Sequence, residues 1–282
     1  RTDGGEGAVT MPPDQSRDRI KCTATEEFFI SSIRPPGYSF LMRSDLSNLL
    51  RFVLALCSIS IATAQTPDTP LVDEAILDCL NIVQDPDGHT NVRSGPSLSS
   101  EIVGRVLSGA PVFAMPESEA DFHQVFLDEK DESVTCHIHG SRLIPARKWK
   151  AVASDGESGR LKHENFEAVV KDPAFVASDH KLTTDATGMV QVDGESPWGQ
   201  DGGIPKRSLT LEVSINGHRV MLPDGATAHI FEPNLETLVL LTPGDPARRA
   251  VLLMTNGDGA GGYFVAWSFE NGIYRGRAMM GL

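Results

Sequence analysis

The sequence is short of cysteine and of aromatic side chains, and it has no excess of positive charge. It has 4 Cys in 282 residues, 6% aromatic residues, and 25 Lys and Arg against 38 Asp and Glu, for a formal net charge of -13. A nucleic-acid partner would require a basic face to neutralise its phosphates, so this balance argues against one. The basic pairs Arg147-Lys148 and Arg248-Arg249 are too short to reverse it, and we interpret each as solvated surface.

Motifs for metal binding, phosphate binding and nucleophilic catalysis are also missing. There is no Cys-x-x-Cys, no His-Glu-x-x-His, no Walker loop, no Gly-x-Ser-x-Gly elbow and no dinucleotide fingerprint. Cys136, His137 and His139 are close in sequence, but alternation along a strand places Cys136 and His137 on opposite faces. We therefore predict no catalytic residue, no cofactor and no metal site, which leaves enzyme activity without support.

No apolar run is long enough to span a membrane. The run from Phe52 to Ile61 is shorter than the ~20 residues that a spanning helix needs. Basic residues at positions 43 and 51 precede it, and Ala62-Thr63-Ala64 follows it, which is the pattern of a signal peptide. A buried helix or a membrane anchor is the alternative interpretation of this run.

We therefore predict a signal peptide over residues 42–64, with the mature chain beginning at Gln65. Residues 1–41 mix Gly, Pro and charge without a period, and we expect them to be a non-native or disordered leader. The protein would be exported to the periplasm or the cell exterior, with no membrane span after cleavage. Cys57 leaves open a lipid-anchored alternative.

The rest of the chain predicts a mostly β fold in two domains. Residues 65–75 are a Pro-rich tether, and 76–145 contain about five short strands at close spacing, typical of a small barrel. Residues 146–161 are polar and read as a linker. Residues 162–282 form a second β-rich unit, with strong hairpin signals at Asn216-Gly217 and Asn271-Gly272.

Two motifs in the first unit carry a family resemblance. One is Asp85-Pro86-Asp87-Gly88, followed by Asn91-Val92-Arg93-Ser94-Gly95-Pro96. The other is His137-Ile138-His139-Gly140-Ser141-Arg142-Leu143 near the end of the unit. Residues of about 76–145 resemble the bacterial SH3-like domain, a small β-barrel of secreted and envelope proteins. In this alignment Phe122 stands where the family often has Trp, and His137 stands at a Tyr position.

The second unit also resembles a known domain. A Trp-Gly-x-Asp-Gly-Gly loop at 198–203, an Asn-x-Asp-Gly-Ala-Gly-x-Tyr loop at 256–263 and a terminal hairpin after Trp267 are similar to an uncharacterised C-terminal domain of secreted bacterial SH3-like proteins. The resemblance implies no activity. We expect the two glycine-dense loops to lie side by side and to form the functional edge of this unit.

These patterns give five candidate ligand-binding residues. They are Phe122, His137, Asp201, Asp258 and Tyr263. The function that the resemblance implies is a non-catalytic binding module of the envelope, with cell-wall glycan-peptide or an envelope protein as partner. An envelope hydrolase or a hydrolase inhibitor with its site in the second unit is the first alternative, and a structural adaptor is the second.

Two cysteines remain after the predicted cleavage, Cys79 and Cys136. An even count in an oxidising compartment favours a disulfide between them. Closing that loop would stabilise the fold by roughly 4 kcal/mol in the chain-entropy description. Two buried thiols are the alternative.

Overall fold

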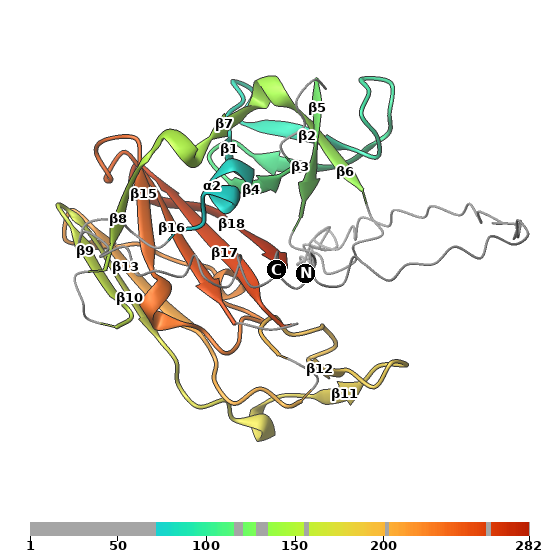
Figure 1. Cartoon of the computed structure of the whole chain (residues 1–282), viewed down its shortest axis with the longest axis vertical. Helices are drawn as coiled ribbons and strands as arrows, with labels where there is room; N and C mark the ends of the chain where they lie inside the picture. The colour runs from blue at the N-terminus through green and yellow to red at the C-terminus, as the bar shows by residue number, and fades with distance from the viewer. Residues whose placement is uncertain are drawn as a thin grey trace, which may run out of the picture.

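Three β-sheets and one small hairpin make up the part of the chain that the structure describes, which is residues 72–115, 121–127, 135–154, 158–200, 203–257 and 261–281 of a computed structural model. The prediction of a mostly β fold, with a small barrel followed by a second β-rich unit, is confirmed. In Figure 1 the barrel lies above the orange and red strands of the C-terminal half, and the hairpin projects from the opposite end.

The barrel is a seven-stranded antiparallel sheet in the order β3-β2-β6-β5-β4-β1-β7. Its strands are β1 (Leu80–Val83), β2 (His89–Arg93), β3 (Ile102–Leu107), β4 (Pro111–Ala114), β5 (Phe122–Phe126), β6 (Cys136–His139) and β7 (Leu143–Pro145). Small apolar side chains fill the interior, among them Val92, Val112 and Ile138. Because this core is small, hydrogen bonds in the turns also contribute to holding the barrel together.

Residues of the two sequence motifs, around Asp85 and around Arg142, hold those turns. The amide of Gly88 donates to the Asp85 carbonyl, and the amide of Asp87 donates to Asp85 Oδ1. Arg142, in the second motif, forms an ion pair with the same residue, with its Nε 3.3 Å from Asp85 Oδ2. Arg93 donates to the carbonyls of Leu98 and Ser100 and so fixes the loop after β2. The two motifs recognised in the sequence are therefore joined by an ion pair in the fold.

The second unit is built on a five-stranded antiparallel sheet in the order β18-β17-β16-β15-β8. Its strands are β8 (Lys150–Ala153), β15 (Val239–Thr242), β16 (Arg249–Asn256), β17 (Tyr263–Glu270) and β18 (Ile273–Gly281). A four-stranded sheet packs on one face; it contains β14 (His218–Arg219), β13 (Thr210–Ile215), β10 (Phe166–Lys171) and β9 (Arg160–His163). The projecting hairpin is β11 (Leu182–Thr184) with β12 (Val190–Val192).

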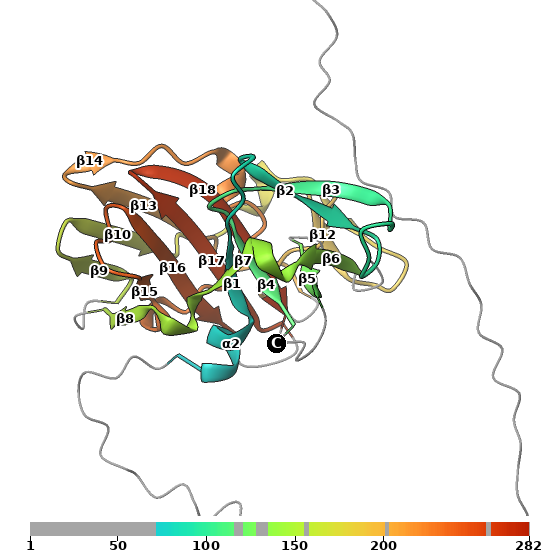
Figure 2. The same cartoon turned by 90° about the horizontal axis from the view of Figure 1, so that it is seen from above.

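The five-stranded sheet is the middle layer of the molecule. On one face Leu240, Leu252 and Trp267 pack against the four-stranded sheet. On the other face Leu241 and Phe264 pack against the barrel. Figure 2 shows the four-stranded sheet and the barrel on opposite sides of the five-stranded sheet. Burial on both faces explains why β15, β16 and β17 read as continuous apolar runs in the sequence rather than as alternating ones.

The two predicted hairpins are confirmed. Ser214 pairs with Arg219 across Asn216-Gly217, and Glu270 pairs with Ile273 across Asn271-Gly272. The first residue of each turn has positive φ, 55° for Asn216 and 52° for Asn271, as does the glycine that follows it. Asn-Gly meets this requirement because both residues tolerate the left-handed region.

The predicted tether is wrong at its end, and the predicted linker is wrong in its middle. Residues of the tether enter helix α2 (Glu74–Cys79), whose first turn is capped by the Asp73 side chain accepting from the Ala75 amide. The predicted linker contains β8, which pairs with β15 along its whole length. Ala151 packs on the core shared with the barrel and Val152 on the core of the second unit. Because side chains alternate along β8, this short strand contributes to both cores. The polar residues on either side of it made the segment look like a linker in the sequence.

The two units are also less separate in the structure than the sequence predicts. One buried cluster joins Leu80, Ile82 and Phe113 of the barrel to Leu241 and Phe264 of the middle sheet. At the edge of this cluster the buried hydroxyl of Ser268 donates to the carbonyl of Gly109 over 2.7 Å. The barrel and the second unit therefore share a hydrophobic core.

The predicted disulfide is not formed: Cys79 and Cys136 do not bridge one another. Cys79 ends α2 beside β1 and packs on the shared core, whereas Cys136 opens β6 in the barrel interior. In the sheet, β4 and β5 lie between β1 and β6. Burial, and then the charge of Asp78, raise the pKa of the Cys79 thiol above its usual value. The structure shows the alternative of two unbridged thiols, of which Cys136 is buried as expected and Cys79 is half-buried.

Candidate functional site

A charged pair continues the row of side chains that faces the barrel from the middle sheet. Arg249 at the start of β16 lies directly opposite Glu270 at the end of β17. The Arg249 Nη2 and Glu270 Oε1 atoms are 2.5 Å apart, and both side chains are largely buried, with 28% and 20% exposed. Glu270 Oε2 also forms an ion pair with Arg275 Nη2, at 3.2 Å. One carboxylate therefore joins two guanidinium groups at the seam between the barrel and the second unit.

The barrel approaches this carboxylate closely through a glycine. A Cβ placed on Gly109 would lie 2.9 Å from Cγ of Arg275 and 3.2 Å from Glu270 Oε2. Gly109 also has φ of 90°, in the region that side chains disfavour. Glycine at this turn lets the barrel backbone rest against the charged cluster, which ties the position of Glu270 to the docking of the barrel.

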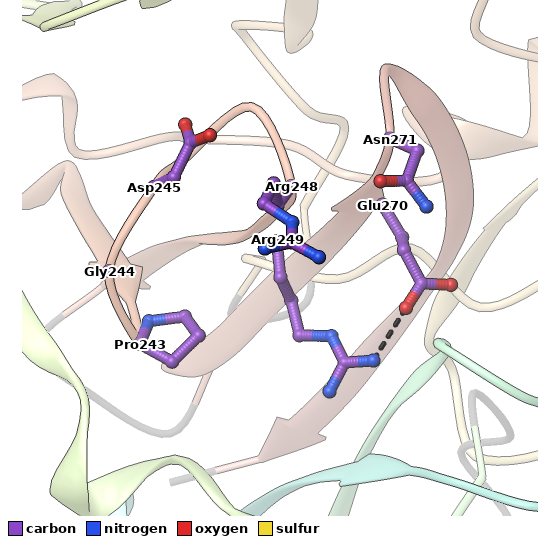
Figure 3. A pocket seen from close by; sticks show the side chains of 7 residues that line it. All are labelled: Pro243, Gly244, Asp245, Arg248, Arg249, Glu270 and Asn271. Carbon is purple, nitrogen blue, oxygen red and sulfur yellow. Dashed lines mark hydrogen bonds and ion pairs between the residues drawn. The ribbon is translucent and has the colours of Figure 1, made fainter.

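Beside this cluster lies a pocket of about 420 Å³. Its lining comes from two turns: Pro243, Gly244, Asp245, Arg248 and Arg249 on one side, and Glu270 and Asn271 on the other. Figure 3 shows Arg249 reaching across to Glu270, while the Arg248 side chain lies between Asp245 and Asn271.

Hydrogen bonds fix both walls of the pocket. In the first turn the Asp245 carbonyl accepts from the amides of Arg248 and Arg249, and its Oδ1 accepts from the amide of Ala247. The second turn is bound to the first, because the Asn271 amide donates to the Arg248 carbonyl over 3.1 Å. Since the backbone is held at both sides, the pocket is formed before any ligand arrives.

Sequence reasoning missed these residues. The Arg248-Arg249 pair was interpreted as solvated surface, and this is wrong for Arg249, whose guanidinium is paired with Glu270. A signal was present in the sequence, because two apolar runs, those of β16 and β17, flank one glycine-dense loop and so suit antiparallel pairing. Antiparallel pairing of such runs places the residues at their outer ends, Arg249 and Glu270, opposite one another.

The predicted ligand-binding residues fall elsewhere. Tyr263 is fully buried, and its hydroxyl donates to the Phe231 carbonyl over 2.8 Å. Its ring lies beside Trp198, and a Cβ on the neighbouring Gly199 would lie only 2.1 Å from the same Phe231 carbonyl oxygen. Tyr263 therefore clamps the 198–199 loop to the middle sheet and presents no surface to a ligand. Asp201 and Asp258 lie outside the described residues.

The two candidates in the barrel are also buried. Phe122 is 6% exposed and His137 is 8% exposed. The Phe122 ring contacts the edge of His139 on the neighbouring strand, with ring centroids 5.0 Å apart. These side chains form part of the barrel rather than a ligand-binding groove, so their prediction as ligand-binding residues is corrected.

A second polar cluster lies at the base of the projecting hairpin. His180 Nδ1 and Asp193 Oδ2 are 2.7 Å apart, and the Lys181 amide donates to Asp193 Oδ1. The hydrogen bond with His180, followed by that from Lys181, lowers the pKa of Asp193. His180 also stacks on Phe175. These contacts close the base of the hairpin and account for the cluster as a structural feature.

Across the described ranges, no group of three or more His, Cys, Asp or Glu side chains is arranged to hold a metal ion. Among the same residues, no helix has the length and apolar character that crossing a membrane requires. Comparisons with protein-family models, with curated proteins and with solved structures gave no match.

Proposed function

We propose that this protein is an exported, non-catalytic binding protein of the bacterial envelope, and that it recognises cell-wall glycan-peptide through the pocket between residues 243–249 and 270–271. The observation that carries the proposal is this preformed pocket, which has guanidinium and carboxylate groups on its walls. Cell-wall peptides carry both carboxylates and amines, so a lining of both signs suits them. Because Arg249 and Glu270 hold one another in place, less entropy is lost when these two groups contact a ligand.

The proposed compartment and family support this choice. The signal-peptide pattern over residues 42–64 favours export, and the turn motifs around Asp85 and Arg142 resemble the bacterial SH3-like domain of envelope proteins. The pocket is lined by residues of the second unit, and Gly109 of the barrel lies against Glu270 in its wall. The proposal therefore assigns recognition to the second unit, with the barrel docked beside the site.

Co-sedimentation with purified peptidoglycan tests the proposal. The wild-type protein should pellet with the insoluble wall at low salt. Arg248→Glu should weaken pelleting by about tenfold or more, because a charge-assisted hydrogen bond contributes about 1.5–3 kcal/mol. Arg219→Glu is the matched control, since Arg219 is exposed on β14 and does not line the pocket. Recovery of the wild-type protein in the supernatant would contradict wall binding.

A further inference from the structure

The charged groups that line the pocket are not all paired with one another. Glu270 is shared between Arg249 and Arg275, at 2.5 and 3.2 Å. The Asp245 carboxylate accepts a backbone hydrogen bond from Ala247, at 2.9 Å. The lining thus holds two guanidinium groups, those of Arg248 and Arg249, and two carboxylates, those of Asp245 and Glu270. A third guanidinium, that of Arg275, pairs with Glu270 from outside the lining, so Glu270 is already engaged by two cations.

Arg248 is the guanidinium that no carboxylate holds. Within the described ranges its side chain makes no hydrogen bond or ion pair, and it is exposed at the pocket mouth. Its neighbour Arg249 uses one of its N–H groups on Glu270, and a guanidinium has five such donors in a fork that matches a carboxylate. Two adjacent cations, one without a partner and one held in place, thus line one wall.

We propose that the pocket binds a carboxylate of its ligand between Arg248 and Arg249. This inference deepens the proposed function and rests on it, since it names the group of the cell-wall peptide that the pocket holds. Arg248 supplies the charge that has no partner. Arg249 adds a second donor whose direction is set by Glu270. Glu270 is a positioning residue: it holds Arg249 on one side and Arg275 on the other, and through Arg275 it contacts Gly109 of the barrel.

The nearby acidic groups select the kind of anion. Asp245 and Glu270 line the same pocket as the two arginines. Both would repel an incoming anion, and they would repel a phosphate with close to two negative charges more strongly than a carboxylate with one. The site therefore favours a monoanionic carboxylate over phosphate. An ammonium group beside that carboxylate would be tolerated for the same reason.

Arginine side-chain NMR tests the assignment directly. The Nε–Hε resonances of the full-length protein are followed during titration with N-acetyl-D-alanine, with its neutral amide, and with inorganic phosphate. Loss of one peak in Arg248→Gln assigns that residue, and this exposed substitution should leave the fold intact. We expect saturable shifts of the Arg248 and Arg249 resonances with the acid, and an affinity at least about tenfold weaker for the amide and for phosphate.

The variants provide the second readout. Arg248→Gln should weaken binding of N-acetyl-D-alanine by about tenfold, whereas Arg219→Gln, which removes an equal charge outside the pocket, should leave it unchanged. Equal shifts with the acid and the amide would overturn the inference, as would equal shifts at Arg219. Tighter saturation by phosphate would overturn the choice of carboxylate.

The two proposals fail in different ways. Pelleting with peptidoglycan that survives Arg248→Gln, with no arginine shift on addition of the acid, would sink the carboxylate site and leave wall binding standing. Specific shifts at Arg248 and Arg249 in a protein that never pellets would sink wall binding and leave the carboxylate site standing.

Discussion

Tyr263 shows how one side chain can serve the fold while its sequence surroundings indicate a binding loop. It follows a glycine-dense segment, and exposed tyrosines in such loops often contact ligands. In the structure its ring is buried, and its hydroxyl donates to the Phe231 carbonyl. Burial, together with the charge of Glu232, raises the pKa of Tyr263 above its usual value near 10. The phenol therefore stays protonated in the folded state well beyond the pH at which it ionises in the unfolded chain.

Tyr263→Phe should lower the free energy of unfolding at pH 8 by about 1–3 kcal/mol, because the buried Phe231 carbonyl loses its donor. The wild-type protein should lose further stability above about pH 10, since the unfolded state then releases a proton that the folded state retains. This part of the loss, about 1.4 kcal/mol per pH unit, should be absent in the variant.

Urea unfolding of both proteins at pH 8, 10 and 11 measures both effects. The difference in unfolding free energy between wild type and variant should shrink as the pH rises from 10 to 11. A difference that stays constant over this range would show that Tyr263 ionises equally in the folded and unfolded states.

At the scale of the element, β8 decides whether residues 146–161 are a linker or part of the body. The strand is short, and the polar residues and turn formers around it predict a linker when the sequence is considered alone. Only pairing with β15, some ninety positions later in the chain, makes it a strand. Short strands at a sheet edge carry little periodicity, so their partners rather than their own residues decide them.

Val152→Asp should therefore lower the free energy of unfolding by about 1–3 kcal/mol, because it places a carboxylate against the core of the second unit. Lys150→Asp is the control in the same strand; its side chain is exposed and its effect should stay within about 0.5 kcal/mol. Chemical denaturation monitored by circular dichroism gives both values. Equal and negligible effects of the two substitutions would restore the linker interpretation.

At the scale of the whole molecule, we expect the barrel and the second unit to unfold together, because they share one core. Phe113 lies on barrel strand β4, is fully buried, and packs in the cluster that also contains Leu241 and Phe264 of the middle sheet. Two domains joined by a flexible linker would unfold independently. A body with a common apolar core loses the packing of both units when either one opens.

Phe113→Ala should lower the free energy of unfolding by about 3–5 kcal/mol. It should shift the unfolding of the middle sheet by the same amount as that of the barrel. Val125→Ala is the comparison, since Val125 belongs to the barrel's own small core. Native-state hydrogen exchange, resolved for β4 and for β16, measures the two units separately. Loss of protection in β4 with β16 unchanged would mean that the units are energetically independent.

Local chemistry in the sequence determined the turns, the hairpins and the mostly β character. Asn216-Gly217 and Asn271-Gly272 need no distant partner to favour their turns, because left-handed backbone is a property of those residues. The motif around Asp85 likewise predicts a turn, because it contains a proline and a glycine. Such features were predictable because their energetics lie within a few residues.

Only the tertiary structure decided the candidate site. Arg249 is separated in the chain from Glu270 and Arg275, and the three charges meet because β16 pairs with β17 and β17 with β18. The same packing buried Tyr263, Phe122 and His137 and kept Cys79 apart from Cys136. Burial and ion pairing depend on which distant segments share one core. A sequence pattern can indicate that a residue is suited to binding, but the packed fold determines whether its surface stays open.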